Sequence, residues 1–374
     1  MPTFVFDEEF SRLGESHAPK PSPEALESPL RVRAIWTYLQ AIKLFERADI
    51  KTAPPALITE EDVLRVHSPY YLDQVKNVAA VGRGELGRGT PANPDLEKLA
   101  TKSAGAAARA VEVASGHAEG SRVCFALGRP PGHKAHAQRA EGNCVFNNVA
   151  VALERLRATK NFDGRVAIVD FDCHFGAGTS SIYYEDPNVL HVDVHEWGPV
   201  GQAFRGSAGE IGAGPGEGTN VNYLVPNGAT NEYYLRALDF CGQIIEQFRP
   251  KFIVVAMGFD AHWSDPAGNL RLDSIAYLRI GHWLSKLSSK VCGGRVAFVL
   301  EGGYSLLVLG RLVEMVLSPF LFNPKPPVPI DLHFRHNVEP AAEKAMRRML
   351  DSQEKKLQEA LAPWWKIFVK PPGA

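Results

Sequence analysis

Three short segments of the chain end an apolar, β-branched run with carboxylate, imidazole or phenol side chains. They are Val166-Ala-Ile-Val-Asp170-Phe-Asp172-Cys-His174, the run from Phe252 to Asp260, and the run from Arg295 to Tyr304. An apolar run that ends in charged residues predicts a buried parallel strand with its ligands at the carboxyl end. Active sites of open α/β sheets lie at that edge. Two aspartates and a histidine there suit zinc or iron(II), which indicates a metal-dependent hydrolase.

The spacing of the acidic residues favours a single ion. Asp172 and His174 are two residues apart, so in an extended chain both side chains point the same way. Asp260 ends another strand and would complete a three-ligand site with positions open for water and substrate. Asp170, in phase with Asp172, would orient a histidine. One aspartate at a strand end is more often a cap or turn residue, but three such motifs in one sheet favour the metal site.

Two further motifs bring proton-transfer groups to the same edge. His133 and His136 follow an expected strand, and a histidine there suits a general base for water, although an isolated loop histidine is usually just hydrogen-bonded. Tyr304 follows two glycines, and its hydroxyl would stabilise an oxyanion if aimed at a substrate carbonyl. A buried core tyrosine is the alternative. The glycine-rich loop at 206–218 lacks the lysine and Ser/Thr of a phosphate loop, which disfavours nucleotide binding.

Alternating strands and helices must position these groups. The pattern predicts a parallel α/β sheet covered on both faces. Strands are expected at 122–127, 166–171, 189–194, 252–257 and 296–300. Helices are expected at 31–47, 96–115, 145–158, 231–248, 274–291 and 339–361, with a capped helix start at Thr59 and loops at 17–30 and 82–94. We expect one domain over residues 1–374, with a motif-bearing core at about 60–320 and a helical extension at about 337–366.

Composition narrows the class of protein. The 374 residues are 45% hydrophobic and 22% charged, as in ordinary globular proteins. A formal net charge of -1 gives no electrostatic case for binding nucleic acid or an anionic membrane. Five scattered cysteines fit reduced thiols, and neither a signal peptide nor a membrane span is evident. We therefore expect a cytoplasmic protein, and the sequence leaves open whether it forms a homo-oligomer.

Together the motifs resemble the zinc-dependent histone deacetylase superfamily, above all its bacterial histone deacetylase-like amidohydrolases and acetylpolyamine amidohydrolases. The resemblance extends from about His67 to Tyr304 and covers most of the chain. It includes Arg129-Pro-Pro-Gly-His133, Gly142-Asn-Cys-Val-Phe-Asn-Asn148, Asp170-Phe-Asp172-Cys-His174, Gly212-Ala-Gly-Pro-Gly216, Gly258-Phe-Asp260 and Glu301-Gly-Gly-Tyr304.

The resemblance implies a single-domain arginase/deacetylase fold with a central eight-stranded parallel sheet flanked by helices. It also implies one zinc ion per chain and a structural potassium ion. By position in the motifs, the zinc ligands would be Asp172, His174 and Asp260, with His133 (paired with Asp170) and Tyr304 as catalytic groups. Potassium would be bound by atoms of Asp170, Asp172, His174, Asp193 and Val194, and the substrate tunnel would be lined by Gly142, Asn143, Phe204 and Gly302.

Departures from the family pattern fall on the proton-transfer groups. The family usually has a second histidine after Pro-Pro-Gly, which is its general base; here that position is Lys134. The usual Asp or Asn partner of that histidine is Ala177, and Phe175 replaces another common histidine. Asn143 stands where a tunnel phenylalanine is usual, and Gly89 where many relatives have a rim aspartate. Lys134, His133 or His136 could then transfer the proton.

The leading hypothesis is a zinc-dependent amidohydrolase that cleaves an N-acyl, acetyl-type amide of a small molecule, with Tyr304 polarising the carbonyl. A polar Asn143 and the absence of a rim aspartate argue against acetyl-lysine proteins and favour acyl-polyamines, natural-product intermediates or xenobiotic amides. The rival is a zinc-binding pseudoenzyme that acts as a ligand sensor or scaffold, with Lys134 and Ala177 as its supporting features. An arginase-like dimanganese site would need further Asp and His ligands where Phe175 and Gly176 stand.

Overall fold

An eight-stranded sheet forms the centre of the molecule. The computed structural model describes residues 2–14, 26–87, 89–118, 121–197, 206–321, 327–331 and 338–368. All neighbouring strands of this sheet are parallel, in the order β2-β1-β5-β10-β9-β6-β7-β8. The strands are β1 Thr3–Val5, β2 Lys51–Ala53, β5 Val123–Ala126, β6 Val166–Asp170, β7 Val189–Glu196, β8 Asn220–Val225, β9 Phe252–Met257 and β10 Val296–Leu300. The expected eight-stranded parallel α/β fold is confirmed.

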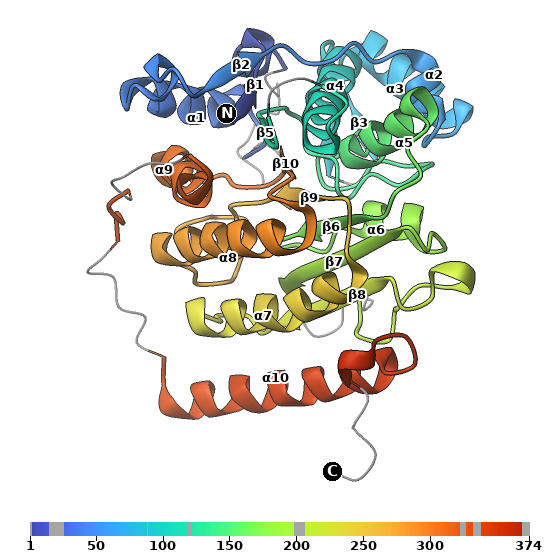
Figure 1. The fold of residues 1–374 in the computed structure, drawn as a ribbon. Helices are drawn as coiled ribbons and strands as arrows, with labels where there is room; N and C mark the ends of the chain where they lie inside the picture. Colours follow the sequence, from blue (N-terminus) through green and yellow to red (C-terminus); the bar gives the residue numbers. More distant parts are fainter. Residues whose placement is uncertain are drawn as a thin grey trace.

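Helices cover both faces of the sheet (Figure 1). One layer contains α1 Pro29–Ala41, α7 Asn231–Phe248, α8 Ser274–Cys292 and α9 Leu306–Leu317. The other contains α4 Leu96–Ser115, α5 Asn148–Lys160 and α6 Ala177–Tyr183, with α2 Glu60–Leu64 and α3 Pro69–Val81 packed outside them. The last helix, α10 Pro340–Leu361, packs beside the edge strand β8. Short 3-10 helices lie at Glu8–Ser11, Leu44–Glu46, Gly214–Gly216, Ser318–Phe320 and Lys366–Phe368.

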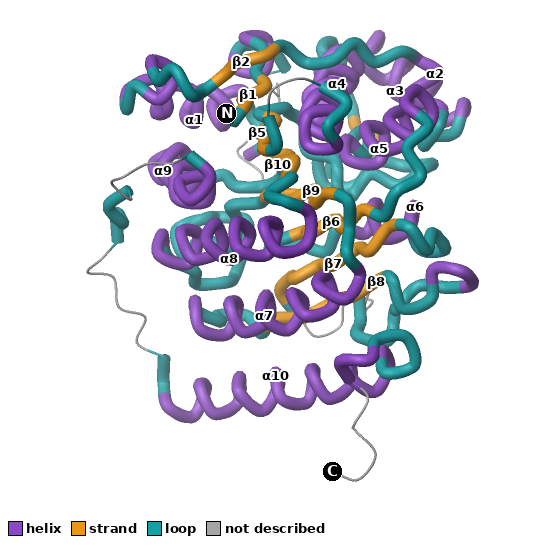
Figure 2. Tube along the Cα trace, viewed as in Figure 1, coloured by secondary structure: helices purple, strands orange, loops and turns teal. Residues whose placement is uncertain are grey.

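The central strands form because their sequences are apolar on both faces. Every residue of β6, β9 and β10 is buried, as expected for parallel strands between two helical layers. The tube view in Figure 2 shows these strands stacked in the middle of the molecule, with helices on either side. Four of these strands are adjacent in the sheet: β5, β10, β9 and β6. Because they are parallel, all four end at the same edge, where the chemistry-bearing motifs begin.

Some element boundaries differ from those expected from the sequence. The helix expected at 31–47 ends at Ala41, because the chain turns at Lys43, whose φ is 57°. The loop expected at 82–94 contains a short antiparallel pair, β3 Glu85–Gly87 and β4 Thr90–Pro91. Most of the loop expected at 17–30 lies outside the described residues. None of the described helices is long and apolar enough to cross a bilayer.

Candidate active site

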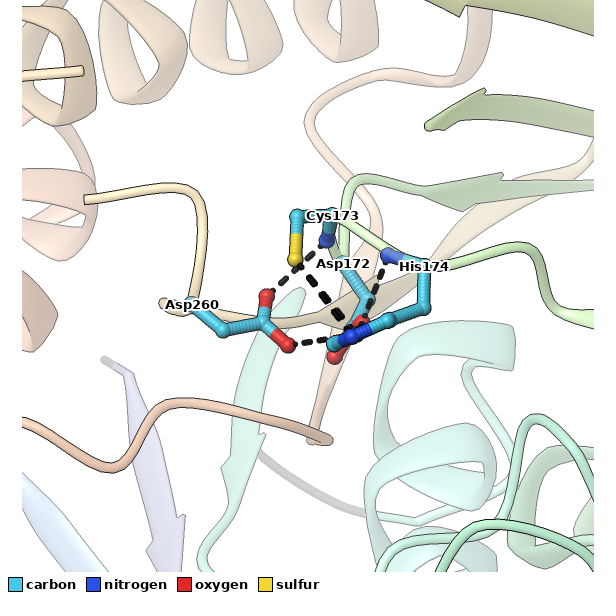
Figure 3. A group of neighbouring side chains, drawn as sticks. All are labelled: Asp172, Cys173, His174 and Asp260. Atoms are coloured by element: carbon cyan, nitrogen blue, oxygen red, sulfur yellow. Dashed lines mark hydrogen bonds and ion pairs between the residues drawn. The ribbon is translucent and has the colours of Figure 1, made fainter. Parts of the chain in front are cut away.

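Two carboxylates and one imidazole converge at the carboxyl ends of β6 and β9. Nδ1 of His174 lies 3.0 Å from Asp172 Oδ1 and 2.9 Å from Asp260 Oδ2. The Cys173 backbone N–H donates to Asp260 Oδ1 over 2.9 Å, which holds that carboxylate against the neighbouring loop. Figure 3 shows the three side chains pointing toward one another. Their ligand atoms all lie within 4.8 Å of one another, close enough to bind one ion.

Two glycines make room for this group. A Cβ atom at Gly302 would lie 2.4 Å from Asp172 Oδ2 and 2.4 Å from Asp260 Oδ2, and one at Gly258 would lie 2.4 Å from Asp172 Oδ2. The Gly302 N–H donates to Asp172 Oδ2 over 2.8 Å. The carboxylates therefore pack against bare backbone that fixes their orientation. Three oxygen and nitrogen donors on rigid strand ends fit a divalent cation of the zinc type.

The electrostatics of the group also fit a cation. Burial raises the pKa of Asp172, but His133 and His174 outweigh it and hold the pKa well below its usual range. Burial and Lys134 lower the pKa of His174, but Asp260 and Asp172 outweigh them and raise it to about 9. A proton on His174 thus stabilises the two carboxylates. A metal ion would replace this proton and supply the same positive charge.

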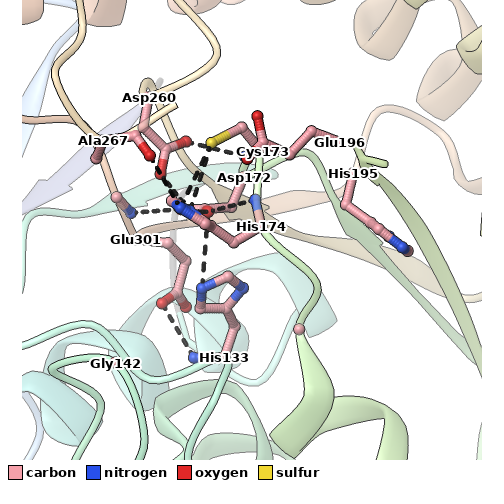
Figure 4. Close-up of polar contacts among 12 residues, drawn as sticks. His133, Gly142, Asp172, Cys173, His174, His195, Glu196, Asp260, Ala267 and Glu301 are labelled. Carbon is pink, nitrogen blue, oxygen red and sulfur yellow. Dashed lines mark hydrogen bonds and ion pairs between the residues drawn. The ribbon is translucent and has the colours of Figure 1, made fainter. Parts of the chain in front are cut away.

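Two carboxylates, Asp170 and Asp172, flank the His133 imidazole, and Figure 4 shows His133 with Asp172 and Glu301. Its Nδ1 is hydrogen-bonded to Asp170 Oδ2 at 3.0 Å, and its Nε2 lies 3.8 Å from Asp172 Oδ1. Glu301 Oε2 accepts the backbone N–H groups of Gly132 at 2.7 Å and His133 at 3.1 Å, which fixes the loop after β5. Burial lowers the pKa of His133, but the charges of Asp170 and Asp172 outweigh burial and raise the pKa to about 10. A cation on Asp172 would weaken this attraction and lower the pKa of His133, which would leave the imidazole unprotonated and able to accept a proton.

Tyr304 follows β10 in a loop that two distant residues hold. Arg31 Nε donates to the Gly303 carbonyl over 2.7 Å, and the Arg31 guanidinium lies 4.7 Å from the centre of the Tyr304 ring. Asp265 Oδ2 accepts the backbone N–H of Tyr304 at 2.6 Å and that of Ser305 at 2.9 Å. Burial raises the pKa of the Tyr304 hydroxyl, which stays protonated and able to donate a hydrogen bond. Sequence reasoning missed Arg31 and Asp265, which have no local motif.

Lys134 lies beside the ligand group. A Cβ at Gly142 would be 2.7 Å from Lys134 Cδ and 3.3 Å from its Nζ, so the side chain runs along this glycine. Burial lowers the pKa of Lys134, but the carboxylates of Asp172 and Asp260 outweigh burial and raise the pKa. A cation on these carboxylates would cancel their attraction, so we expect the pKa of Lys134 to fall when zinc binds.

The other expected tunnel residues lie close to Lys134 where the structure describes them. Asn143 adopts the left-handed conformation with φ of 66°, which asparagine tolerates well. Its backbone N–H donates to the Gly89 carbonyl over 2.8 Å, so the segment with the short strands packs on the Gly142–Asn143 turn. Gly302 lies at the metal ligands, as described above. Phe204 lies outside the described residues.

His136 lies apart from the ligand group. Its Nδ1 is hydrogen-bonded to Ser181 Oγ at 2.8 Å, and Arg139 donates to its Nε2 over 2.8 Å. His136 lines a separate cleft together with Phe175 and Ala177. Because both ring nitrogens have partners there, His136 is the weakest of the three candidates for proton transfer.

A second buried acidic pair lies one strand away. Asp170 of β6 and Asp193 of β7 face each other in register and are fully buried. A Cβ at Gly176 would lie 2.4 Å from Asp170 Oδ2 and 3.1 Å from Asp193 Oδ2, so both carboxylates approach one point. Burial and Asp193 raise the pKa of Asp170 above its usual range, although His133 opposes them. A bound cation would relieve this repulsion.

Comparisons with known proteins agree with the resemblance. A family model described as "Histone deacetylase domain" matches residues 25–320. The chain is 37% identical over 281 residues to a "Histone deacetylase-like amidohydrolase" of Pseudomonas aeruginosa, covering 75% of this chain and 72% of that protein. It is 36% identical over 287 residues to a "Probable deacetylase" of Methanothermobacter thermautotrophicus, covering 76% and 82%. The crystal structure of the HDA15 HD domain has a TM-score of 0.78 at 28% identity, covering 98% of this chain and 100% of that chain.

Proposed function

The chain belongs to the histone deacetylase family, and from this premise we propose that it is a zinc-dependent amidohydrolase acting on an N-acyl amide of a small molecule. The observation that carries the proposal is the convergence of Asp172, His174 and Asp260 within 4.8 Å at the strand ends. These three residues would hold one zinc ion. When bound, zinc polarises a carbonyl and lowers the pKa of water to about 7.

Tyr304 is the proposed carbonyl-binding group. Its hydroxyl stays protonated, and Arg31 and Asp265 fix the backbone on both sides of it. A donor held in place before the reaction stabilises the oxyanion without a reorganisation cost. Tyr304 would thus donate to the substrate oxygen as negative charge develops there.

His133 and Lys134 are the proposed proton-transfer groups. The Asp170 carboxylate binds Nδ1 of His133 and leaves Nε2 facing the ligand group, so Nε2 is the atom that would accept the proton from water. Lys134 lies near the same carboxylates and would donate to the leaving amine or to the oxyanion. Activity would therefore depend on both residues.

The proposed substrate is small. Gly142, Asn143, Gly302 and Phe204 are proposed to line its tunnel, with Asn143 making the wall polar. Gly89, which packs on Asn143, offers no side chain to bind a peptide backbone. Acyl-polyamines, natural-product intermediates and xenobiotic amides fit this site better than acetyl-lysine proteins, and we expect no nucleic acid partner.

We also propose a structural potassium ion and a cytoplasmic location. Potassium would bind near the buried Asp170 and Asp193 pair, with oxygen atoms of Asp172, His174 and Val194 nearby. The cytoplasmic location is supported by the five free cysteines, which a reducing compartment keeps unpaired.

Zinc analysis combined with hydrolysis of a panel of N-acyl amides tests the proposal. We expect about one zinc per chain, and turnover that Asp172→Ala and Tyr304→Phe each abolish or strongly reduce. Small amides should be hydrolysed faster than acetyl-lysine peptides. Bound zinc without any turnover that depends on these residues would instead favour the sensor or scaffold hypothesis, to which the lysine at position 134 points.

A further inference from the structure

The side chain of Lys134 is confined beside the metal ligands. It follows His133 directly, and its Cδ and Nζ lie 2.7 Å and 3.3 Å from the point that a Cβ at Gly142 would occupy. The first of these distances is shorter than real Cβ contacts, so the lysine stem runs directly against the bare backbone of Gly142. Lys134 is half-buried, and its ammonium group lies near the ligand carboxylates with some contact to solvent.

Within the described part of the chain, no carboxylate lies within 4.0 Å of the Lys134 ammonium and no group is hydrogen-bonded to it. Its main attraction comes from Asp172 and Asp260, which would be neutralised by zinc. Two other carboxylates lie nearby: Asp170 binds His133, and Glu301 Oε2 accepts backbone N–H groups while its Oε1 has no hydrogen-bond partner among the described residues. With the metal bound, Lys134 would thus lose the attraction of Asp172 and Asp260 and have no carboxylate within ion-pair distance among the described residues.

The acidic residue next to Gly142, Glu141, forms ion pairs with His136 and Arg139. Gly142 has no side chain, and Asn143 is neutral. The Cys144 thiol is buried, and burial raises its pKa far enough to keep it neutral. An anionic group on the ligand would supply the charge partner that Lys134 then lacks, and a charge-assisted hydrogen bond would hold it here.

We propose that Lys134 determines specificity by binding a carboxylate that the substrate carries next to its scissile amide. This inference rests on the proposed function and narrows its substrate class to anionic N-acyl amides, which leaves out the cationic acyl-polyamines. Two substrate classes present such a carboxylate. N-acyl amino acids carry it on the amine side, and half-amides of dicarboxylic acids carry it on the acyl side. Either one would supply the counter-ion that the protein lacks.

Matched pairs of compounds distinguish the two classes. For the amine side, an N-acetyl amino acid is compared with its methyl ester; for the acyl side, an N-succinyl anilide is compared with the N-acetyl anilide. Hydrolysis gives kcat/KM for each compound with the zinc-loaded protein. Calorimetry gives the affinity of each compound for zinc-loaded Tyr304→Phe protein, in which Lys134 is unchanged, as a second readout that does not depend on turnover. Lys134→Met removes the charge with a similar stem, and Lys134→Arg retains the charge.

We expect the wild-type protein to prefer the anionic member of at least one pair by about tenfold or more. Lys134→Met should remove this preference in both kcat/KM and affinity, whatever its overall activity, and Lys134→Arg should keep part of it. Preference for the neutral member in both pairs, or a preference that Lys134→Met leaves intact, would overturn the inference while amide hydrolysis stands. Absence of hydrolysis for all compounds, in spite of bound zinc, would instead reject the proposed function.

Discussion

Replacing Gly302 with alanine perturbs the proposed metal site without altering a ligand atom. The new Cβ would lie 2.4 Å from Asp172 Oδ2 and 2.4 Å from Asp260 Oδ2, whereas real Cβ contacts stay beyond 3.0 Å. Each carboxylate oxygen must therefore move by at least about 0.6 Å, which exceeds the ~0.5 Å tolerance of a preorganised site. Changes to groups that orient metal ligands cost about 10- to 100-fold in metal affinity, and we expect a loss of this size in zinc affinity.

Competition with a chromogenic chelator measures this zinc affinity. Gly209→Ala is the matched control, because a Cβ there meets nothing within 4 Å and its φ is not in the left-handed region. Near-ultraviolet circular dichroism establishes that both variants keep the native packing. If folded Gly302→Ala bound zinc as tightly as Gly209→Ala, the carboxylates of Asp172 and Asp260 would not be the ligands, and the metal site would have to be placed elsewhere.

Three further predictions concern Tyr304, the buried acidic pair and His67. Tyr304→Phe should lower kcat by about 10²- to 10³-fold and leave zinc affinity unchanged, because the hydroxyl acts on the substrate oxygen. Potassium should raise the melting temperature of the wild-type protein more than choline does, and Asp193→Asn should reduce this difference. The buried imidazole of His67 donates to the His136 carbonyl and accepts the Asn147 N–H, and burial lowers its pKa from 6.5 to about 4. Since the unfolded chain binds this proton first, the free energy of unfolding should fall by about 3 kcal/mol as the pH drops from 6.5 to 4.

Each of these predictions has a control. Unchanged kcat in Tyr304→Phe would remove the tyrosine from the mechanism. Equal melting temperatures in potassium and choline would contradict a potassium site at Asp193. For His67, denaturant melts from pH 7 to pH 4 compare the wild-type protein with His67→Gln, which can make both hydrogen bonds but does not titrate. The two proteins should differ in pH dependence, and parallel curves would show that His67 is not the group responsible.

The sequence predicts the centre of the sheet well because its strands are apolar on both faces. Val166–Asp170 and Phe252–Met257 read as buried strands from their residues alone, and their ligands follow directly. The edge elements carry weaker signals. Thr3–Val5 and Lys51–Ala53 are three residues long, and Asn220–Val225 alternates asparagines with apolar residues although every position is buried. Their pairing depends on neighbours distant in the sequence, so only the family resemblance indicated eight strands.

The candidate site shows the same division between local and distant information. The D-x-H motif and the strand-end aspartate identify three adjacent side chains, because β6 and β9 are neighbours in the sheet. By contrast, Arg31 acts on the Tyr304 loop from 272 residues away, as measured to Gly303, and no local pattern marks it. Arg31 reaches this loop because α1 packs in the helical layer next to β10. The periodicity of the sequence predicts a helix there, but it does not predict where that helix packs.

Zinc titration of chelator-stripped protein tests the central claim most directly. Turnover of an N-acyl amide is measured as zinc is added back in known equivalents. The site formed by Asp172, His174 and Asp260 predicts that hydrolysis is absent at first, rises in proportion to added zinc and saturates near one equivalent per chain. Full hydrolysis by the stripped protein, or no hydrolysis at any amount of zinc, would contradict it.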